Sequence, residues 1–249
     1  MQVRAEQIEV FDSADSAHFK GKLTAHIRED FPKHSAVLGD EGVREVVRYG
    51  MAQSKTHGFT QQSPVSLFTD LTLLLGRRFD HDPQMPWAAW TLKDESPVDE
   101  LERARRLHAA ATAYLNEASG PANEYIDAAQ SRLLDEPVQI NTASSAAFAK
   151  EVTQRLDRIW PEKNRQLSDE SRSALIREAV TKARLYKIES QSGALMCTLM
   201  MYLLGVGFDE DPMFAWAQKI LSSDLERDAK LGKLHQASMT CLRQWCAKG

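Results

Sequence analysis

Cysteine is scarce and basic residues are not in excess, so neither a disulfide scaffold nor a nucleic-acid-binding surface is expected. The three cysteines, Cys197, Cys241 and Cys246, form an odd set without a CxxC spacing, which favours a reduced compartment over a disulfide framework. The 31 Lys and Arg residues are outnumbered by 35 Asp and Glu residues. Without a basic block, the chain lacks the charge that binds nucleic-acid phosphates.

Long apolar runs are also missing. The run from Ala194 to Phe208 is shorter than the roughly 20 residues that a membrane-spanning helix needs. A similar run earlier in the chain contains Asp70, Arg77 and Arg78, so both runs are predicted to be core helices. The N-terminal residues include acidic groups and no apolar core, which argues against a secretory signal or a transit peptide. We therefore expect a cytoplasmic protein without a membrane span.

Enzyme motifs are absent as well. The sequence contains no GxSxG, HExxH or P-loop pattern, no dinucleotide-binding fingerprint after a strand, and no Cys/His quartet. Its 43% hydrophobic and 27% charged residues are typical of a folded globular protein. We therefore expect a folded, non-enzymatic protein without a cofactor or a bound metal.

The main feature that is present is an internal duplication. Phe19 aligns with Phe148, and the same spacing holds without a gap as far as Asp94 and Ser223. About a quarter of the aligned residues are identical, whereas unrelated sequences would match at about one position in sixteen. A short deletion then brings Leu107 and His108 into register with Leu234 and His235. The chain is therefore predicted to be a tandem repeat.

The strongest match is the pattern LLGxxFDxDPxxxWAxxxL, which we call the first motif at Leu74 to Leu92 and the second motif at Leu203 to Leu221. We interpret its shared residues as a structural signature of the repeat. They are Gly76, Phe79, Asp80, Asp82, Pro83 and Trp87 in the first motif, and Gly205, Phe208, Asp209, Asp211, Pro212 and Trp216 in the second.

Each copy is predicted to contain about five helices, because apolar residues recur at helical spacing and strand patterns are almost absent. The first helix ends before Pro32 or Pro161. The third ends at Gly76 or Gly205, since glycine suits a left-handed C-terminal cap. The fourth begins at Asp82-Pro83 or Asp211-Pro212, where aspartate caps the helix and proline needs no amide partner.

These elements give an all-α fold with two homologous helical subdomains. The predicted boundaries are residues 1–118 for the first repeat, 119–140 for a linker, and 141–249 for the second repeat. The linker contains the turn-forming Ser119-Gly120-Pro121 and a short segment up to Leu134 that could be helical.

The acidic residues of the two motifs raise the question of a metal site. Asp80, Asp82, Asp209 and Asp211 could supply oxygen ligands to Mg²⁺ or Ca²⁺, as in a metal-dependent helical hydrolase. Helix capping explains the aspartate before each proline better, and no EF-hand spacing supports metal binding. Trp87 and Trp216 are likewise interpreted as core residues and not as a binding pocket, because each lies one turn into a helix that is expected to pack on the apolar third helix.

The differences between the copies point to function, since shared residues are needed for folding. Arg77, Arg78 and Trp90 in the first copy correspond to Val206, Gly207 and Lys219 in the second. Arginine and tryptophan are enriched in the energetic centres of protein interfaces. We therefore predict that Arg77, Arg78 and Trp90 contact a protein partner.

The segments HIREDFP, LGDEGVREVVRYGMAQSKTHGF and LLGRRFDHDPQMPWA resemble a family of small bacterial proteins associated with type VI secretion gene islands, near spike proteins and effector adaptors. The second copy departs from that pattern with Ala215 in place of Pro86. The resemblance implies a cytoplasmic adaptor or co-chaperone that helps to load an effector onto the secretion spike. The alternative is an immunity protein that neutralises a cognate effector.

Overall fold

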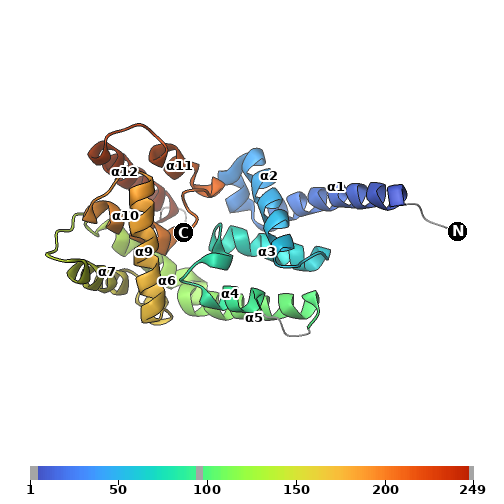
Figure 1. The fold of residues 1–249 in the computed structure, drawn as a ribbon, viewed down its shortest axis with the longest axis horizontal. Coiled ribbons are helices and arrows are strands. Elements are labelled where there is room, and N and C mark those ends of the chain that lie inside the picture. Colours follow the sequence, from blue (N-terminus) through green and yellow to red (C-terminus); the bar gives the residue numbers. More distant parts are fainter. Residues whose placement is uncertain (1–4, 94–97, 247–249) are drawn as a thin grey trace. The chain divides into compact units, whose positions relative to one another are not determined.

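The computed structural model describes residues 5–93 and 98–246, and these residues form helices, turns and loops without a β-strand (Figure 1). The predicted all-α class is therefore confirmed. The α-helices are α1 (Ala5–Asp30), α2 (Pro32–Thr56), α3 (Gln62–Leu75), α4 (Pro86–Leu92), α5 (Glu100–Ser119), α6 (Glu124–Leu134), α7 (Ser145–Ile159), α8 (Pro161–Arg165), α9 (Asp169–Leu185), α10 (Gln191–Leu204), α11 (Ala215–Leu221) and α12 (Arg227–Cys246). Short 3-10 turns are η1 (Phe79–His81), η2 (Pro121–Asn123) and η3 (Pro212–Phe214).

The chain divides into two compact units. The first unit comprises Met1–Leu74 and Glu95–Arg105, and the second comprises Leu75–Asp94 and Arg106–Gly249. Almost all of the first motif therefore belongs to the same unit as the second motif. The repeat boundaries expected from the sequence stay a prediction.

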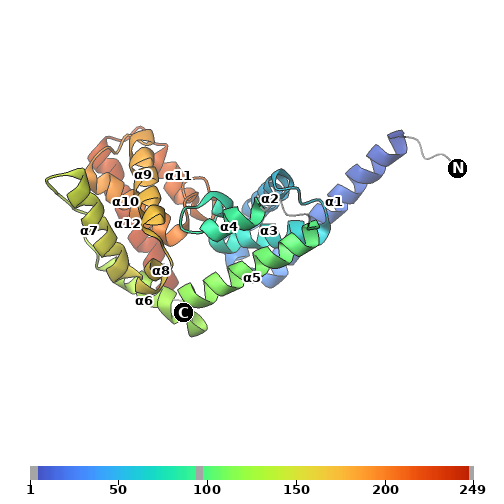
Figure 2. The same cartoon turned by 60° about the horizontal axis from the view of Figure 1, so that its bottom comes forward.

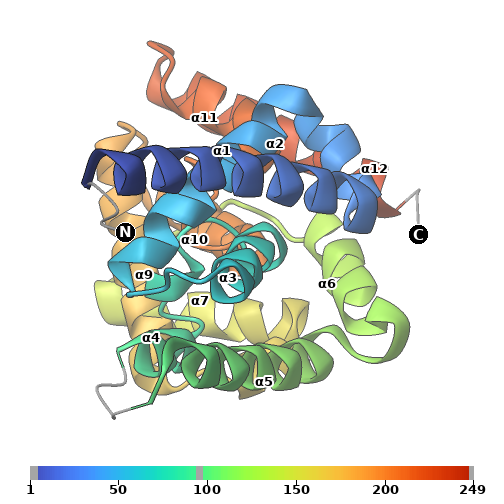
Figure 3. The same cartoon turned by 90° about the vertical axis from the view of Figure 1, so that its right-hand side faces the viewer.

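In the first unit, α1 crosses α2 and the two helices pack against each other (Figure 3). Their apolar faces supply the core residues Leu23, Ile27, Val43, Val46 and Val47. Helix α2 is interrupted at Gly39, whose φ of 61° and ψ of 179° are not helical. The buried valines Val43, Val46 and Val47 all lie after this kink.

A histidine links α1 to α3 in the first unit. His26 Nδ1 lies 2.6 Å from Asp30 Oδ2, and His26 Nε2 lies 3.0 Å from each carboxylate oxygen of Asp70. Burial alone would lower the pKa of His26, but the hydrogen bond to Asp70 and the charges of Asp70 and Asp30 raise it above its ordinary value. When it is protonated, the imidazole therefore links the two helices through both carboxylates.

This contact predicts a pH dependence of stability. Because the folded pKa of His26 lies above the unfolded value of about 6.5, its contribution is complete below that pH and is lost as the pH rises through the folded pKa. We expect the wild type to lose up to about 1 kcal/mol relative to His26→Gln between about pH 6 and about pH 8.5, as for a partly exposed ion pair. Urea unfolding at both pH values measures this difference, and parallel pH profiles of the two proteins would contradict it.

In the second unit, α9 and α10 lie side by side (Figure 2). All residues of α10 are buried except Gln191, Ser192 and Leu203. This confirms the prediction that the apolar run beginning at Ala194 is a central core helix. Among the residues that the structure describes, no helix has both the length and the apolar character needed to cross a membrane.

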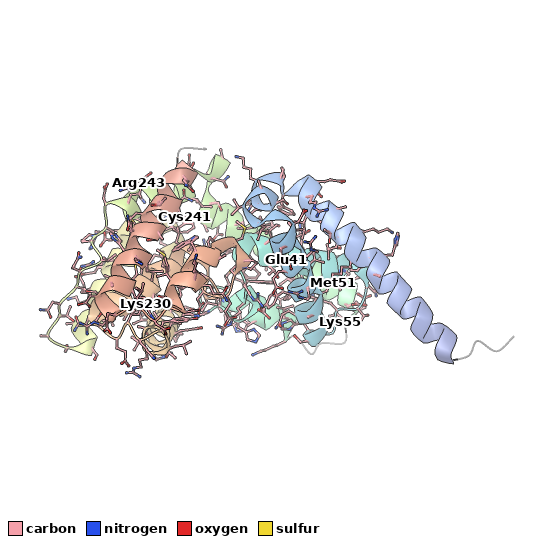
Figure 4. The ribbon with its side chains drawn as sticks, turned by 90° about the horizontal axis from the view of Figure 1, so that it is seen from above. Glu41, Met51, Lys55, Lys230, Cys241 and Arg243 are labelled. Carbon is pink, nitrogen blue, oxygen red and sulfur yellow. The ribbon has the colours of Figure 1, made fainter. Side chains whose placement is uncertain are left out.

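Lys230, a buried cation on α12 (Figure 4), binds the ends of two other helices. Lys230 is 3% exposed, and its Nζ donates to the carbonyl oxygens of Tyr186 and Leu221, each at 3.1 Å. These carbonyls lie at the C-terminal ends of α9 and α11, where the helix dipoles favour positive charge. These two hydrogen bonds and the helix dipoles therefore account for the burial of the Lys230 ammonium group. Cys241, on the same helix, is a free thiol of intermediate burial, and Cys197 in α10 is a buried free thiol.

Several predicted helix boundaries are confirmed and one is wrong. Helices α1 and α7 end before Pro32 and Pro161, and α6 ends at Leu134. The fourth helix does not begin at the Asp-Pro pairs: α4 begins at Pro86, and Asp211 caps η3 before α11 begins at Ala215. A turn at Pro83 and Gln84 thus separates Asp82 from α4, and η3 separates Asp211 from α11.

Candidate functional site

The two motifs meet in the second unit at their glycines. Gly76 has a φ of 93° and Gly205 a φ of 90°, a left-handed region in which glycine is favoured. A Cβ atom on Gly76 would lie 2.8 Å from the carbonyl oxygen of Leu204, and one on Gly205 would lie 2.9 Å from that of Leu75. Glycine is therefore required twice over, for the turn and for the close approach of the two backbones.

The aspartates before the prolines connect the two motifs by exchanged hydrogen bonds. Asp82 Oδ2 accepts from the amide of Val206, and Asp211 Oδ2 accepts from the amide of Arg77, each at 2.9 Å. The other oxygen of each carboxylate accepts a local amide, that of Gln84 at 2.8 Å or that of Met213 at 2.9 Å. Each aspartate thus caps its own turn and also binds the other motif.

Both carboxylates are buried, with Asp82 at 2% and Asp211 at 5% exposure. Desolvation raises the pKa of each, while the amide hydrogen bonds oppose that shift. Protein donors contact both oxygens of each carboxylate, so the hydrogen bonds that stabilise the fold account for the presence of these two aspartates. Among the residues that the structure describes, no three His, Cys, Asp or Glu side chains form a group that could hold a metal ion.

The first aspartate of the second motif forms a buried ion pair. Asp209 is 1% exposed, its Oδ1 accepts from Lys182 Nζ at 2.6 Å, and its Oδ2 accepts from the Tyr186 hydroxyl at 2.6 Å. Burial raises the pKa of the neighbouring Cys197 thiol to about 12, the charge of Lys182 opposing the shift. In the first motif, Asp80 is also buried and lies 3.2 Å from His81 Nδ1.

A third buried lysine, Lys163, lies near Asp82. Lys163 Nζ donates to the carbonyl oxygen of Tyr202 at 2.6 Å and lies 4.8 Å from the centre of the Trp160 ring. Desolvation lowers the pKa of Lys163 to about 8, and the charge of Asp82 limits the shift. Gln84 completes this region, since its side-chain amide donates to Asp82 and to the carbonyl oxygen of Met201 at 2.9 Å.

Sequence reasoning missed the buried lysines and Gln84. Lys182 follows Leu175 and Ala179 on the buried face of α9, so the helical pattern places a charge in the core. A buried charge needs a partner, and the repeated Asp209 was available as one. Lys163 lies in the short helix α8, where the sequence has no comparable periodic pattern.

The three predicted partner residues separate into two kinds. Arg77 Nη1 donates to the carbonyl oxygen of Glu210 at 3.2 Å, and Arg78 Nη1 lies 3.5 Å from Glu178 Oε1. Arg78 also has a left-handed φ of 66°, which is unusual for a residue with a side chain. Both arginines thus contact polar groups of their own unit. Trp90 is different, because its side chain is exposed to solvent.

Trp90 lies on α4 and is 72% exposed, and its indole is the largest of the exposed apolar side chains that the structure describes. Trp87, one turn earlier, is half-buried and packs on Tyr114 with ring centres 5.6 Å apart. Lys219, the counterpart of Trp90 in the second motif, is exposed and polar. The two equivalent helices therefore present different chemistry to solvent at this position, an aromatic ring on α4 and an ammonium group on α11.

The second unit thus combines a buried contact between two motifs with the exposed indole of Trp90. No protein-family model, no curated protein and no solved structure matches the chain. The functional argument therefore depends on the chemistry of these residues.

Proposed function

We propose that the chain arose by duplication of a helical unit, in two subdomains of about five helices each. Equal helix lengths support this: α3 and α10 have 14 residues, α4 and α11 have 7, and α5 and α12 have 20. The exchanged hydrogen bonds of Asp82 and Asp211 involve equivalent atoms of the two motifs. In this proposal the shared residues maintain the fold, and function lies in residues that differ.

We further propose a non-enzymatic role, as a cytoplasmic adaptor or co-chaperone that binds a type VI secretion effector or spike protein. The observation that carries the proposal is the exposure of Trp90. A solvated indole exposes a large apolar surface, and tryptophan is enriched among residues that dominate binding energy. The structural roles of Asp82, Asp209 and Asp211 favour binding over metal-dependent hydrolysis.

The test is crosslinked affinity purification of the tagged protein from its native cells, with partners identified by mass spectrometry. Wild type is compared with Trp90→Ala and with Leu185→Ala, which removes another apolar side chain that is 67% exposed. We expect the wild type and Leu185→Ala to recover an effector or spike protein. Trp90→Ala should recover at least about 30-fold less, since a central contact contributes 2 kcal/mol or more.

Three other results have defined meanings. If Trp90→Ala recovers as much partner protein as the wild type, Trp90 is not part of the binding surface. If the wild type recovers no secretion component, the adaptor role is excluded. Recovery of a toxin without a spike protein, together with inhibition of that toxin by the purified chain, would establish the immunity alternative instead.

A further inference from the structure

A short non-helical segment before α7 is held by side chains that bind its backbone. The amide of Thr142 donates to Gln191 Oε1 at 2.8 Å, and its carbonyl oxygen accepts from Gln191 Nε2 at 3.0 Å. Two residues earlier, the amide of Ile140 donates to Ser192 Oγ at 3.3 Å. The Gln191 side chain thus imitates the pair of hydrogen bonds that one residue makes in an antiparallel β-ladder. Because these contacts use backbone groups, they suit an extended peptide of almost any sequence.

The first copy has the same two side chains at the equivalent position. With the spacing of the duplication, Gln191 and Ser192 align with Gln62 and Ser63. Each pair begins a helix of 14 residues, α10 in the second copy and α3 in the first. Gln191 and Ser192 are partly buried, whereas Gln62 and Ser63 are exposed. The first copy therefore carries the groups of this backbone-binding site on its surface.

Helices α1 and α3 correspond to α7 and α10. Helix α7, Ser145–Ile159, aligns with residues 16–30, which form the C-terminal part of α1. In the first copy α1 contacts α3 through His26 and Asp70, and in the second copy α7 contacts α10. The chain before residue 16 is therefore placed relative to α3 as the chain before residue 145 is placed relative to α10.

The similarity between the copies extends to the bound segment itself. Residues 11–15, with the sequence FDSAD, align with residues 140–144, with the sequence INTAS. Ser144 is the N-cap of α7, since its side chain accepts from the amide of Ala147. Its counterpart Asp15 is a residue type that caps helices equally well. The sequence of the first copy is thus suited to a helix that begins at residue 16, after a non-helical segment.

In the structure, residues 11–15 instead extend α1. Helix α1 has 26 residues and α7 has 15, and the additional residues all precede residue 16. The N-terminal end of α1 projects away from α2 and α3 (Figure 1), so its helical state depends mainly on its own sequence. Isolated helices shorter than about 12–15 residues are marginal in water, and aspartate and serine are weak helix formers. A second conformation of this segment therefore needs little stabilisation.

We propose that Gln62 and Ser63 form a binding site for an extended peptide backbone, and that residues 11–15 of the same chain occupy it in a second conformation. In this conformation the amide and carbonyl groups of Ser13 bind the side chain of Gln62, and the amide of Phe11 donates to Ser63. Helix α1 then begins at residue 16, with Asp15 as its N-cap. The proposal rests on the proposed duplication. It gives the protein a segment that changes between a projecting helix and a bound strand.

The test is NMR spectroscopy of the isotopically labelled full-length protein. Cα chemical shifts distinguish helical from extended residues, and we expect extended values for residues 12–14 in the wild type. In Gln62→Ala, which shortens an exposed side chain, the amide of Ser13 should exchange with solvent at least about fivefold faster, because two hydrogen bonds are lost. Gln62→Glu should have a smaller effect, since a carboxylate still accepts from the amide but cannot donate to the carbonyl.

The matched control is Gln191→Ala in the second copy. It should accelerate exchange at the amide of Thr142 at least about fivefold and leave Ser13 unchanged. Circular dichroism checks that each variant is folded. The proposal is overturned if residues 12–14 have helical shifts in the wild type, or if the Ser13 amide exchanges equally fast in the wild type and in Gln62→Ala. Either result would refute the site in the first copy without refuting the duplication or the role of Trp90, which have separate tests.

Discussion

Replacing Gly205 with alanine is expected to destabilise the protein by roughly 3 kcal/mol or more. The φ of 90° and ψ of 158° at this residue lie in a region that is open almost only to glycine. The added Cβ would also lie 2.9 Å from the carbonyl oxygen of Leu75, which is backbone and cannot rotate away. Equilibrium unfolding in urea, compared with the wild type, measures the loss.

The matched control for this substitution is Gly232→Ala. Gly232 lies in α12, and a Cβ added there would have no atom within 4 Å, so alanine should stabilise that helix by about 0.5–1 kcal/mol. Gly76→Ala should resemble Gly205→Ala, and the double variant should lose less than the sum, because both substitutions disrupt one contact. If Gly205→Ala is as stable as the wild type, the motifs do not meet as described.

Replacing Lys182 with methionine is expected to cost about 3–5 kcal/mol, since it leaves Asp209 buried without its cation. Adding Asp209→Asn should restore part of the loss, because the amide oxygen still accepts from the Tyr186 hydroxyl and no charge remains in the core. Lys219→Met, at an exposed position on α11, should change stability by less than about 0.5 kcal/mol. Chemical unfolding of all four proteins at neutral pH gives these differences.

The helices could be predicted from the sequence because their signals are local. Proline at residues 32 and 161 and glycine at residues 76 and 205 mark helix ends, and the apolar run of α10 predicts a buried helix. The starts of α4 and α11 are not where the sequence predicts them, because aspartate followed by proline also opens a simple turn, as at Asp82, or a 3-10 turn, as at Asp211. The sequence predicts that Asp82 and Asp211 cap their own turns. It does not predict the hydrogen bond that each aspartate also accepts from an amide of the other motif.

The site was less predictable because its main contacts join residues that are far apart in the chain. The amides of Val206 and Arg77 carry no sequence signal, since every residue except proline has one. Exposure of Trp90 and engagement of Arg78 by Glu178 likewise depend on the fold. Differences between the copies identified all three residues, but they could not separate an exposed ring from two engaged arginines.

The exchanged hydrogen bonds of Asp82 and Asp211 have an evolutionary consequence under the proposed duplication. A contact in which equivalent atoms of two copies bind each other is self-complementary, as in a two-fold symmetric dimer. A single-copy ancestor would thus have carried the surface to form a homodimer. Joining the copies in one chain replaces an association that depends on concentration with an intramolecular one. It also frees each copy from symmetry, so that the two equivalent helices could come to differ, with Trp90 in one and Lys219 in the other.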